Sequence, residues 1–322
     1  MSKVEIQLLS DRLPAENPHI LAEIDLLRQG LFKDIGWHYY VDLIWVILQL
    51  QQSGLKPGST ILDAGAGSGL LQFLLSYYGY HVLSVDFAPR KIPFYIRKLF
   101  PIETLSTAAT SHEHYVAHMA LARSRYNLIR KLWLYSVNQK FQLSSWFRLK
   151  RALSSHEPRP GKVTIIQNDM RQMRQVTSQS VDAVVSVSAV EHMEPDQLPF
   201  VINEFARVMK PEAGLILTTN ASGTDQSWFH EPSQGWCYSL ASIEAWFTNC
   251  SKSKGYFTDY SILLEDYQKN DFLRQRLAQF HYFSANNGMP NGVWNPVYIP
   301  VGVKAQRNDL IVQHSISGTQ NA

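Results

Sequence analysis

Cysteine is scarce in this sequence. Only Cys237 and Cys250 occur among 322 residues, too few for the disulfide framework on which small secreted domains depend. Long apolar runs are also missing: the longest, residues 39–50, contains Asp42 and is too short to span a bilayer. The first five residues lack the apolar core of a secretory signal. We therefore expect a cytoplasmic protein without a transmembrane segment.

Charge of either sign is modest, and no repeat or low-complexity tract is present. Charged residues make up 18% of the chain, hydrophobic residues 45%, and the net charge is +3. This is ordinary globular composition, and the chain is long enough to bury a sizeable core. Composition alone therefore indicates a folded protein and leaves its activity open.

Glycines gather where one apolar run ends. Residues 61–69 read ILDAGAGSG, which places Gly65, Gly67 and Gly69 in a turn. Glycine is needed where a strand turns sharply into a helix and where a Cβ would collide with a bound molecule. Asp86 ends the next apolar run, and a carboxylate there can accept hydrogen bonds from ribose hydroxyls. The pattern predicts a nucleotide-like cofactor; the alternative is a glycine-rich turn that binds nothing.

The glycine spacing separates two kinds of cofactor. A dinucleotide fingerprint reads G-x-G-x-x-G, and its third glycine would fall on Leu70. Here Asp63 precedes three alternating glycines, which resembles motif I of the class I S-adenosylmethionine-dependent methyltransferases, D/E-x-G-x-G-x-G. The resemblance implies S-adenosylmethionine as cofactor. It places the backbone of Gly65, Ala66 and the residues up to Gly69 against the methionine part, with Asp63 ordering the turn.

The same resemblance assigns further residues to the cofactor. Asp86 would hold the ribose, and Phe87 would lie against the adenine. The β-branched run 163–167 leads into what looks like the family's third loop, where Asp169 reaches the adenine amino group and Met170 covers the ring. The expected cofactor residues are completed by Ser188, after the next strand, and Tyr40, in a segment where relatives place a lid.

Strand and helix signals alternate as far as residue 220. The continuous apolar run 181–188 is typical of a strand buried on both faces, and apolar residues recur at helical spacing over 200–209. The motifs S-x-x-E-H-M, R-V-M-K-P and T-T-N in this order resemble ubiquinone-biosynthesis O-methyltransferases and related small-molecule and sugar methyltransferases. This resemblance implies an α/β fold with a Rossmann-like, seven-stranded, mostly parallel sheet and helices on both faces. One departure is Glu212-Ala213-Gly214, where the family has two glycines.

The expected catalytic groups follow the run 181–188, in a loop that lies near the methyl group in this fold. Methyl transfer is an in-line displacement that depends on positioning, and a base is needed only when the acceptor carries a proton. His192 is the expected base because imidazole titrates near neutrality. Glu191 would orient it or, as the family resemblance allows, help to hold a divalent ion. Alternatively, both residues cap the next helix and contact only the cofactor.

A basic, aromatic segment separates the second and third expected strands. From residue 90 to 162, fourteen Lys and Arg face three acidic residues, a net charge of +11, which leaves −8 for the rest of the chain. The expected organisation is an N-terminal helical segment at 1–36, a cofactor-binding domain at 37–89 and 162–304, a basic helical insert after the second strand at 90–161, and a flexible tail at 305–322.

Three interpretations of the insert are open. It is a helical cap whose apolar stripe over 126–137 packs on the core. In the second, which is compatible with the first, it roofs the site and receives a small anionic or glycosylated metabolite, methylated on oxygen or nitrogen. In the third, it contacts RNA or a membrane surface. His114 and His118 would share a helix face, but without further ligands they favour solvated histidines over a metal site. A catalytically idle cofactor-binding protein is a further alternative.

Overall fold

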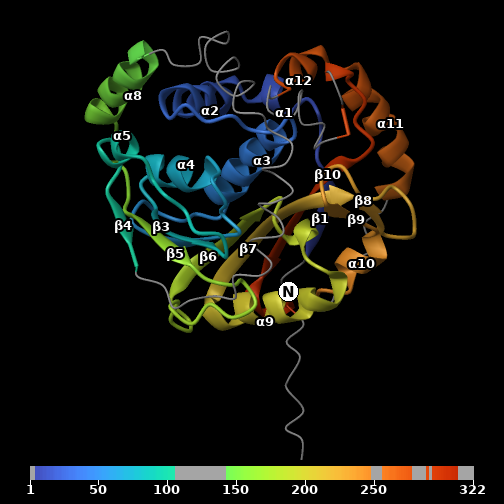
Figure 1. Ribbon diagram of the computed structural model, residues 1–322. Helices are drawn as coiled ribbons and strands as arrows, with labels where there is room; N and C mark the ends of the chain where they lie inside the picture. The colour runs from blue at the N-terminus through green and yellow to red at the C-terminus, as the bar shows by residue number, and fades with distance from the viewer. Residues whose placement is uncertain (1–3, 106–142, 248–255, 278–287, 290–291, 311–322) are drawn as a thin grey trace, which may run out of the picture.

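The computed structural model describes residues 4–105, 143–247, 256–277, 288–289 and 292–310. Its strands form one sheet between two layers of helices (Figure 1). The strands are β1 (Glu5–Leu8), β2 (Thr60–Ala64), β3 (His81–Asp86), β4 (Ile102–Thr104), β5 (Val163–Gln167), β6 (Val181–Val187), β7 (Met209–Ala221), β8 (Trp228–His230), β9 (Gly235–Tyr238) and β10 (Ile299–Gln306). The helices are α1 (Leu13–Glu16), α2 (Pro18–Gly30), α3 (Tyr39–Gln52), α4 (Leu71–Tyr77), α5 (Phe94–Arg97), α8 (Leu143–Ser155), α9 (Leu198–Val208), α10 (Leu240–Glu244), α11 (Tyr256–Lys269) and α12 (Asp271–Gln275), with 3-10 turns η1 (Val190–His192), η2 (Pro195–Gln197) and η4 (Arg307–Asp309).

The sheet has the order β1-β10-β7-β6-β2-β3-β5-β4. Neighbours from β4 to β7 run parallel, whereas β10 is antiparallel to both β7 and β1. The predicted mostly parallel, Rossmann-like sheet is confirmed. The predicted number of strands is corrected, because the described residues contain ten strands and not seven. The strands without a sequence signal are β1, β4 and the β8–β9 hairpin, all of only three or four residues.

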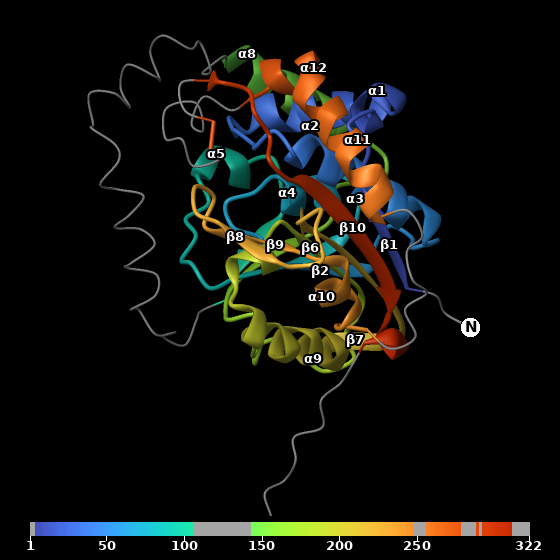
Figure 2. The same cartoon turned by 90° about the vertical axis from the view of Figure 1, so that its right-hand side faces the viewer.

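Helices cover both faces of the sheet. In the side view, α9 and α10 lie on one face, and α2 and α3 lie on the other (Figure 2). α3 is apolar nearly all round and is buried along most of its length, as expected for a helix in the core. Close packing is visible at Gly302 in β10, where a Cβ would lie only 2.6 Å from the Trp45 ring. None of the described helices is long and apolar enough to cross a bilayer.

The segments outside the expected cofactor domain have mixed structure. In the segment 1–36, residues of β1 join the sheet, where Glu5 pairs with Lys304. At the other end, β10 continues to Gln306 and η4 follows it, so ordered structure extends past residue 304. Within the insert, β4 pairs with β5, and α8 packs on α2. The stripe over 126–137, His114 and His118 lie outside the described residues.

Candidate functional site

The glycine turn joins β2 to α4. Gly65 and Gly67 have φ angles of +77° and +50°, in the left-handed region that suits glycine. A Cβ on Gly65 would lie 2.3 Å from the Ala189 Cβ, so protein packing requires glycine there. A Cβ on Gly67 would meet nothing closer than the Gly69 nitrogen at 3.9 Å. Gly67 therefore faces open space at the carboxyl edge of the sheet, where ligands bind in α/β folds.

Asp86 joins β3 to this turn. Its Oδ2 accepts a hydrogen bond of 2.8 Å from the Gly67 N–H, and its Oδ1 accepts one of 2.8 Å from the Ala88 N–H. Asp86 is buried, whereas the Phe87 side chain next to it is 45% exposed. The structure thus brings three predicted residues, Gly67, Asp86 and Phe87, to one edge of the sheet.

Two cations flank the glycine turn, and sequence reasoning missed both. The Arg90 guanidinium donates to the Ser84 hydroxyl at 2.6 Å, to the Ile166 carbonyl at 3.0 Å and to the Gly67 carbonyl at 3.4 Å. The Lys33 ammonium donates to the Ser68 carbonyl, and burial, with the Arg90 charge, lowers its pKa to about 8. Arg90 is the first residue of the segment that the sequence predicts as the basic insert. The signal that could have identified Arg90 is that the carboxylates Asp63 and Asp86, at the ends of adjacent strands, need a positive charge nearby.

Asp63 is the most enclosed carboxylate of the turn. It is 2% exposed, and its Oδ2 has no hydrogen-bond partner among the described residues. Burial raises the pKa of Asp63 to about 7; Arg90 opposes this shift and Asp86 adds to it. A buried acid of this kind is partly protonated near neutral pH, because desolvation penalises the charged form, and a further positive group would favour its ionisation.

The raised pKa of Asp63 predicts a pH-dependent stability. Unfolding returns the carboxyl from a pKa of about 7 to its ordinary value of 3.8, so between these values the folded state holds a proton that the unfolded state lacks. The free energy of unfolding should therefore fall as pH rises, by about 1.4 kcal/mol per pH unit at most. In urea titrations at pH 5.0 and 7.5, Asp63→Asn should lose less stability than the unmodified protein.

The matched control for this experiment is Asp196→Asn, at an exposed carboxylate. It should show the same pH dependence as the unmodified protein. Equal slopes for Asp63→Asn and Asp196→Asn would contradict the assignment of a raised pKa to Asp63.

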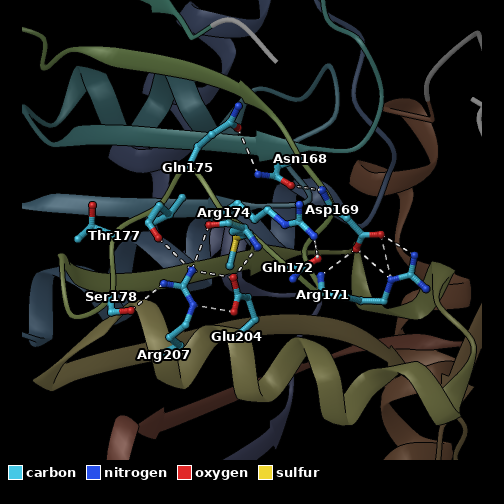
Figure 3. Close-up of polar contacts among 12 residues, drawn as sticks. Asn168, Asp169, Arg171, Gln172, Arg174, Gln175, Thr177, Ser178, Glu204 and Arg207 are labelled. Atoms are coloured by element: carbon cyan, nitrogen blue, oxygen red, sulfur yellow. Dashed lines mark hydrogen bonds and ion pairs between the residues drawn. The ribbon is translucent and has the colours of Figure 1, made fainter. Parts of the chain in front are cut away.

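The loop after β5 carries Asp169 and Met170. The Asp169 carboxylate accepts two bonds of 3.0 Å from the Arg171 guanidinium (Figure 3). Burial acts to raise the pKa of Asp169, but the Arg171 bonds outweigh it and hold the pKa below its ordinary value. The Met170 sulfur lies 3.2 Å from a Cβ placed on Gly65. Met170 therefore reaches the glycine turn, while the Asp169 carboxylate is engaged by Arg171.

α9 anchors the continuation of the same loop. The Arg207 guanidinium donates to the carbonyls of Met173 and Val176 at 3.1 and 2.9 Å, and to the Ser178 hydroxyl at 2.9 Å (Figure 3). The Glu204 carboxylate pairs with Arg207 at 2.7 Å. This network fixes the loop at the edge of the sheet and leaves Asp169 and Met170 in a set position.

The end of β6 brings Ser188 and Glu191 into the same region. Ser188 has a φ of +47°, unusual for a residue with a side chain. Its hydroxyl donates to Asp42 Oδ2 at 3.2 Å. Glu191 is 2% exposed and accepts a bond of 3.3 Å from the Thr219 hydroxyl. His192 is exposed, and its Nδ1 lies 2.8 Å from the Gln234 carbonyl, in the turn between β8 and β9.

The two tyrosines of the lid segment point in different directions. Tyr40 is turned toward α2 and α12, with its hydroxyl 3.5 Å from Asp25 Oδ1 and its ring against Phe272. Its neighbour Tyr39 lies near the carboxylates instead: burial, then the charges of Glu191, Asp42, Asp63 and Asp86, raise the pKa of the Tyr39 hydroxyl. Successive helical residues point about 100° apart, so only one of the two tyrosines can face the site. Of the two, Tyr39 is the tyrosine that lies beside these carboxylates.

Comparison with known proteins finds a partial similarity to one domain family. Residues 132–217 match the family model described as a methyltransferase domain, a span that includes β5, β6 and α9 but not the glycine turn. No curated protein matches the sequence. The match covers less than half of the chain and shows a similarity to that domain family. It does not single out the ubiquinone-biosynthesis branch.

Several solved structures resemble the chain. A putative sarcosine dimethylglycine methyltransferase from Galdieria sulphuraria is 15% identical, with 84% of this chain and 85% of that chain covered and a TM-score of 0.42. Phosphoethanolamine N-methyltransferase 2 from Haemonchus contortus is 14% identical, with 92% of this chain and 59% of that chain covered and a TM-score of 0.42. A protein from Pyrococcus horikoshii OT3 is 20% identical, with 55% of this chain covered and a TM-score of 0.30. The match covers 53% of that protein, so this chain spans about half its length.

Proposed function

We propose that this chain transfers the methyl group of S-adenosylmethionine to an oxygen or nitrogen atom of a small molecule. The observation that carries the proposal is the open space in front of Gly67, beside the Asp86 carboxylate. A glycine with a positive φ and no protein atom in the way of a Cβ is what a cofactor cradle requires. The unpartnered Asp63 oxygen fits a ligand that carries positive charge.

In this proposal, different residues contact different parts of the cofactor. The backbone from Gly65 through Ala66 to Gly69 would hold the methionine part, and Asp86 would accept hydrogen bonds from the ribose. Phe87 and Met170 would contact the adenine. When bound, S-adenosylmethionine supplies an electrophilic methyl group on a positively charged sulfur. Asp63 would lose its proton when that charge arrives, because an adjacent cation favours the ionised carboxylate.

Glu191 and His192, the expected catalytic pair, are kept in the proposal at the end of β6, next to Ser188. The buried Glu191 carboxyl is suited to face a bound molecule. The exposed His192 would act as a base through Nε2, since Nδ1 lies against a backbone carbonyl. Their neighbour Ala189 packs on Gly65, so the loop that carries them borders the cofactor turn.

An anionic or glycosylated part of the acceptor remains a proposal that rests on the insert. Described basic residues of the insert are only partly neutralised: the Lys98 and Lys150 ammonium groups lie over the rings of Phe94 and Trp146, at 4.7 and 5.3 Å. Their positive charge is thus available to a negatively charged group at a distance from the reacting atom.

Replacement of Asp86 tests the proposed cofactor site. Asp86→Ala removes the acceptor for the ribose hydroxyls and should weaken S-adenosylhomocysteine binding by roughly 1–3 kcal/mol, a loss of about 5- to 150-fold. Isothermal titration calorimetry on folded protein measures this loss. Asp225→Asn, on the surface loop after β7, should bind as the unmodified protein does. Unchanged affinity in folded Asp86→Ala would remove Asp86 from the site.

A further inference from the structure

Two buried carboxylates lie beside the proposed cofactor site: Glu191, which belongs to the proposed catalytic pair, and Asp42, which has no assigned role. Asp42, in the first turn of α3, is fully buried, and Glu191 is 2% exposed. Asp42 Oδ1 accepts no hydrogen bond from any described residue. In the described part of the chain, neither carboxylate forms an ion pair with a Lys or Arg; Asp42 pairs only with His38, at 2.8 Å. Buried negative charge without a fixed cation is costly and requires a partner.

Aromatic rings surround these carboxylates. The ring of His38 stacks on that of Tyr39 with centroids 4.6 Å apart, and the Tyr298 ring lies 6.3 Å from His38. Both Asp42 and Glu191 contribute to the raised pKa values of Tyr39 and Tyr298, after burial. By contact, His38 joins Tyr39 and Tyr298 to Asp42, and Glu191 follows three residues after Ser188, which bonds to Asp42. Aromatic faces combined with carboxylates are the usual surroundings of a bound organic cation.

The cluster adjoins the proposed cofactor site through β6. Ser188 bonds to Asp42, and the next residue, Ala189, packs against Gly65 of the glycine turn. The positive φ of Ser188 is the kind of backbone strain that concentrates at ligand sites. Asp63 and Asp86 lie on the cofactor side of this boundary, where Arg90 offsets their charge. Asp42 and Glu191 therefore add negative charge beyond what the turn carries.

We propose that the acceptor is an amine, which enters as an ammonium ion and is bound by Asp42, Glu191 and the rings of His38, Tyr39 and Tyr298. The inference rests on the proposed methyltransferase function and specifies its substrate class at the reacting atom. Burial raises the pKa of Glu191, against the opposing effect of His192 and His38, so this carboxyl ionises fully only when a cation is present. A neutral hydroxyl group would offer these carboxyl groups no countercharge.

His38 is positioned to receive the proton that the ammonium must lose. Its Nδ1 faces the Asp42 carboxylate, which fixes the tautomer with a free electron pair on Nε2 and stabilises the imidazolium. The ammonium gives a proton to His38 Nε2, and the freed nitrogen pair forms the bond to the methyl carbon. The carbon–sulfur bond breaks with its electrons going to sulfur, which leaves S-adenosylhomocysteine and the N-methylated ammonium. The proton then passes from His38 to solvent.

Two cofactor analogues test the charge of this cluster without a known acceptor. Sinefungin carries an ammonium group where the methylated sulfur would be, whereas S-adenosylhomocysteine is uncharged there. Calorimetry at pH 7.5 should show that sinefungin binds about tenfold more tightly than S-adenosylhomocysteine. In Asp42→Asn and in Glu191→Gln, the ratio of the two affinities should fall toward one. Glu212→Gln, at an exposed carboxylate on β7, should keep it. Equal affinities in the unmodified protein, or a preference that survives both variants, would overturn the inference; failure of both ligands to bind would overturn the proposed function instead.

A panel of matched acceptors tests the substrate class directly. Phenethylamine is compared with 2-phenylethanol, and glycine with glycolate, by release of S-adenosylhomocysteine. Methylation confined to the amines is the expected result; transfer to an alcohol, or to neither member of any pair, contradicts it. With an active amine, His38→Gln should lose turnover at pH 7 and regain it at pH 9–10, where the amine deprotonates without help. A loss confined to His192→Gln would give the proton-accepting role to His192.

Discussion

Gly67→Val is expected to abolish S-adenosylmethionine binding while the protein stays folded. The valine side chain would occupy the open space in front of Gly67, where the nearest protein atom is 3.9 Å from the Cβ position. A loss of at least about 100-fold in affinity, roughly 2.7 kcal/mol, should be measurable by calorimetry with S-adenosylhomocysteine. The packing of the protein itself gives no reason for valine to be excluded there.

The backbone strain of this substitution needs its own control. Gly54 also has a positive φ, +75°, and a Cβ there meets no atom within 4 Å, but it lies in the turn after α3. Gly54→Val should lose comparable stability and keep full affinity. Gly65→Val should behave differently from both and fail to fold, because its Cβ would overlap Ala189. Normal binding by Gly67→Val would displace the glycine turn as the cofactor site.

Arg90→Met should destabilise the protein by about 3 kcal/mol. The substitution removes a buried positive charge that acts on the buried carboxylates Asp63 and Asp86, and buried charge left without such compensation typically costs about this much. It also removes donors to the carbonyls of Ser84 and Ile166, at 2.5 and 3.0 Å, which connect β3 to the end of β5. Urea unfolding should show a larger loss at pH 7.5 than at pH 5.0, because protonation of Asp63 at the lower pH relieves the repulsion.

A surface arginine provides the comparison. Arg159 pairs with Glu157, and both side chains are mostly exposed, so Arg159→Met should change stability by no more than about 0.5 kcal/mol. The stability lost with Arg90→Lys should lie between the losses for Arg90→Met and Arg159→Met, since lysine retains the charge but lacks the planar set of donors. A cost below about 1 kcal/mol for Arg90→Met would mean that Arg90 does not stabilise the turn.

The parts of the fold that sequence could predict are those with a strong local signal. The β-branched or apolar runs of β5 and β6 are long enough to indicate strands, and the glycine spacing identifies the turn after β2. Asp86 is recognisable because its place at a strand end follows from that turn. The register of the parallel strands then brings the ends of β2 and β3 together, as the pairing of Ala64 with Val85 shows.

The parts that sequence could not predict depend on contacts between distant segments. β1 and β4 are too short to have a pattern of their own and exist because β10 and β5 offer free edges. Tyr39 and Tyr40 are adjacent, and only the orientation of α3 decides which of them faces the carboxylates. Arg90 looks like one basic residue among fourteen in the insert, and its role becomes clear only when β2, β3 and β5 lie side by side.

Gly161 lies in a tightly packed place where the chain returns from the insert to the sheet. The Gly161 N–H donates to the Ser76 carbonyl at 2.8 Å, and a Cβ on Gly161 would lie 2.0 Å from the Tyr80 oxygen. These contacts fix the point at which the chain enters β5, so a change in the length of the segment between β3 and β5 would leave the ends of both strands in place.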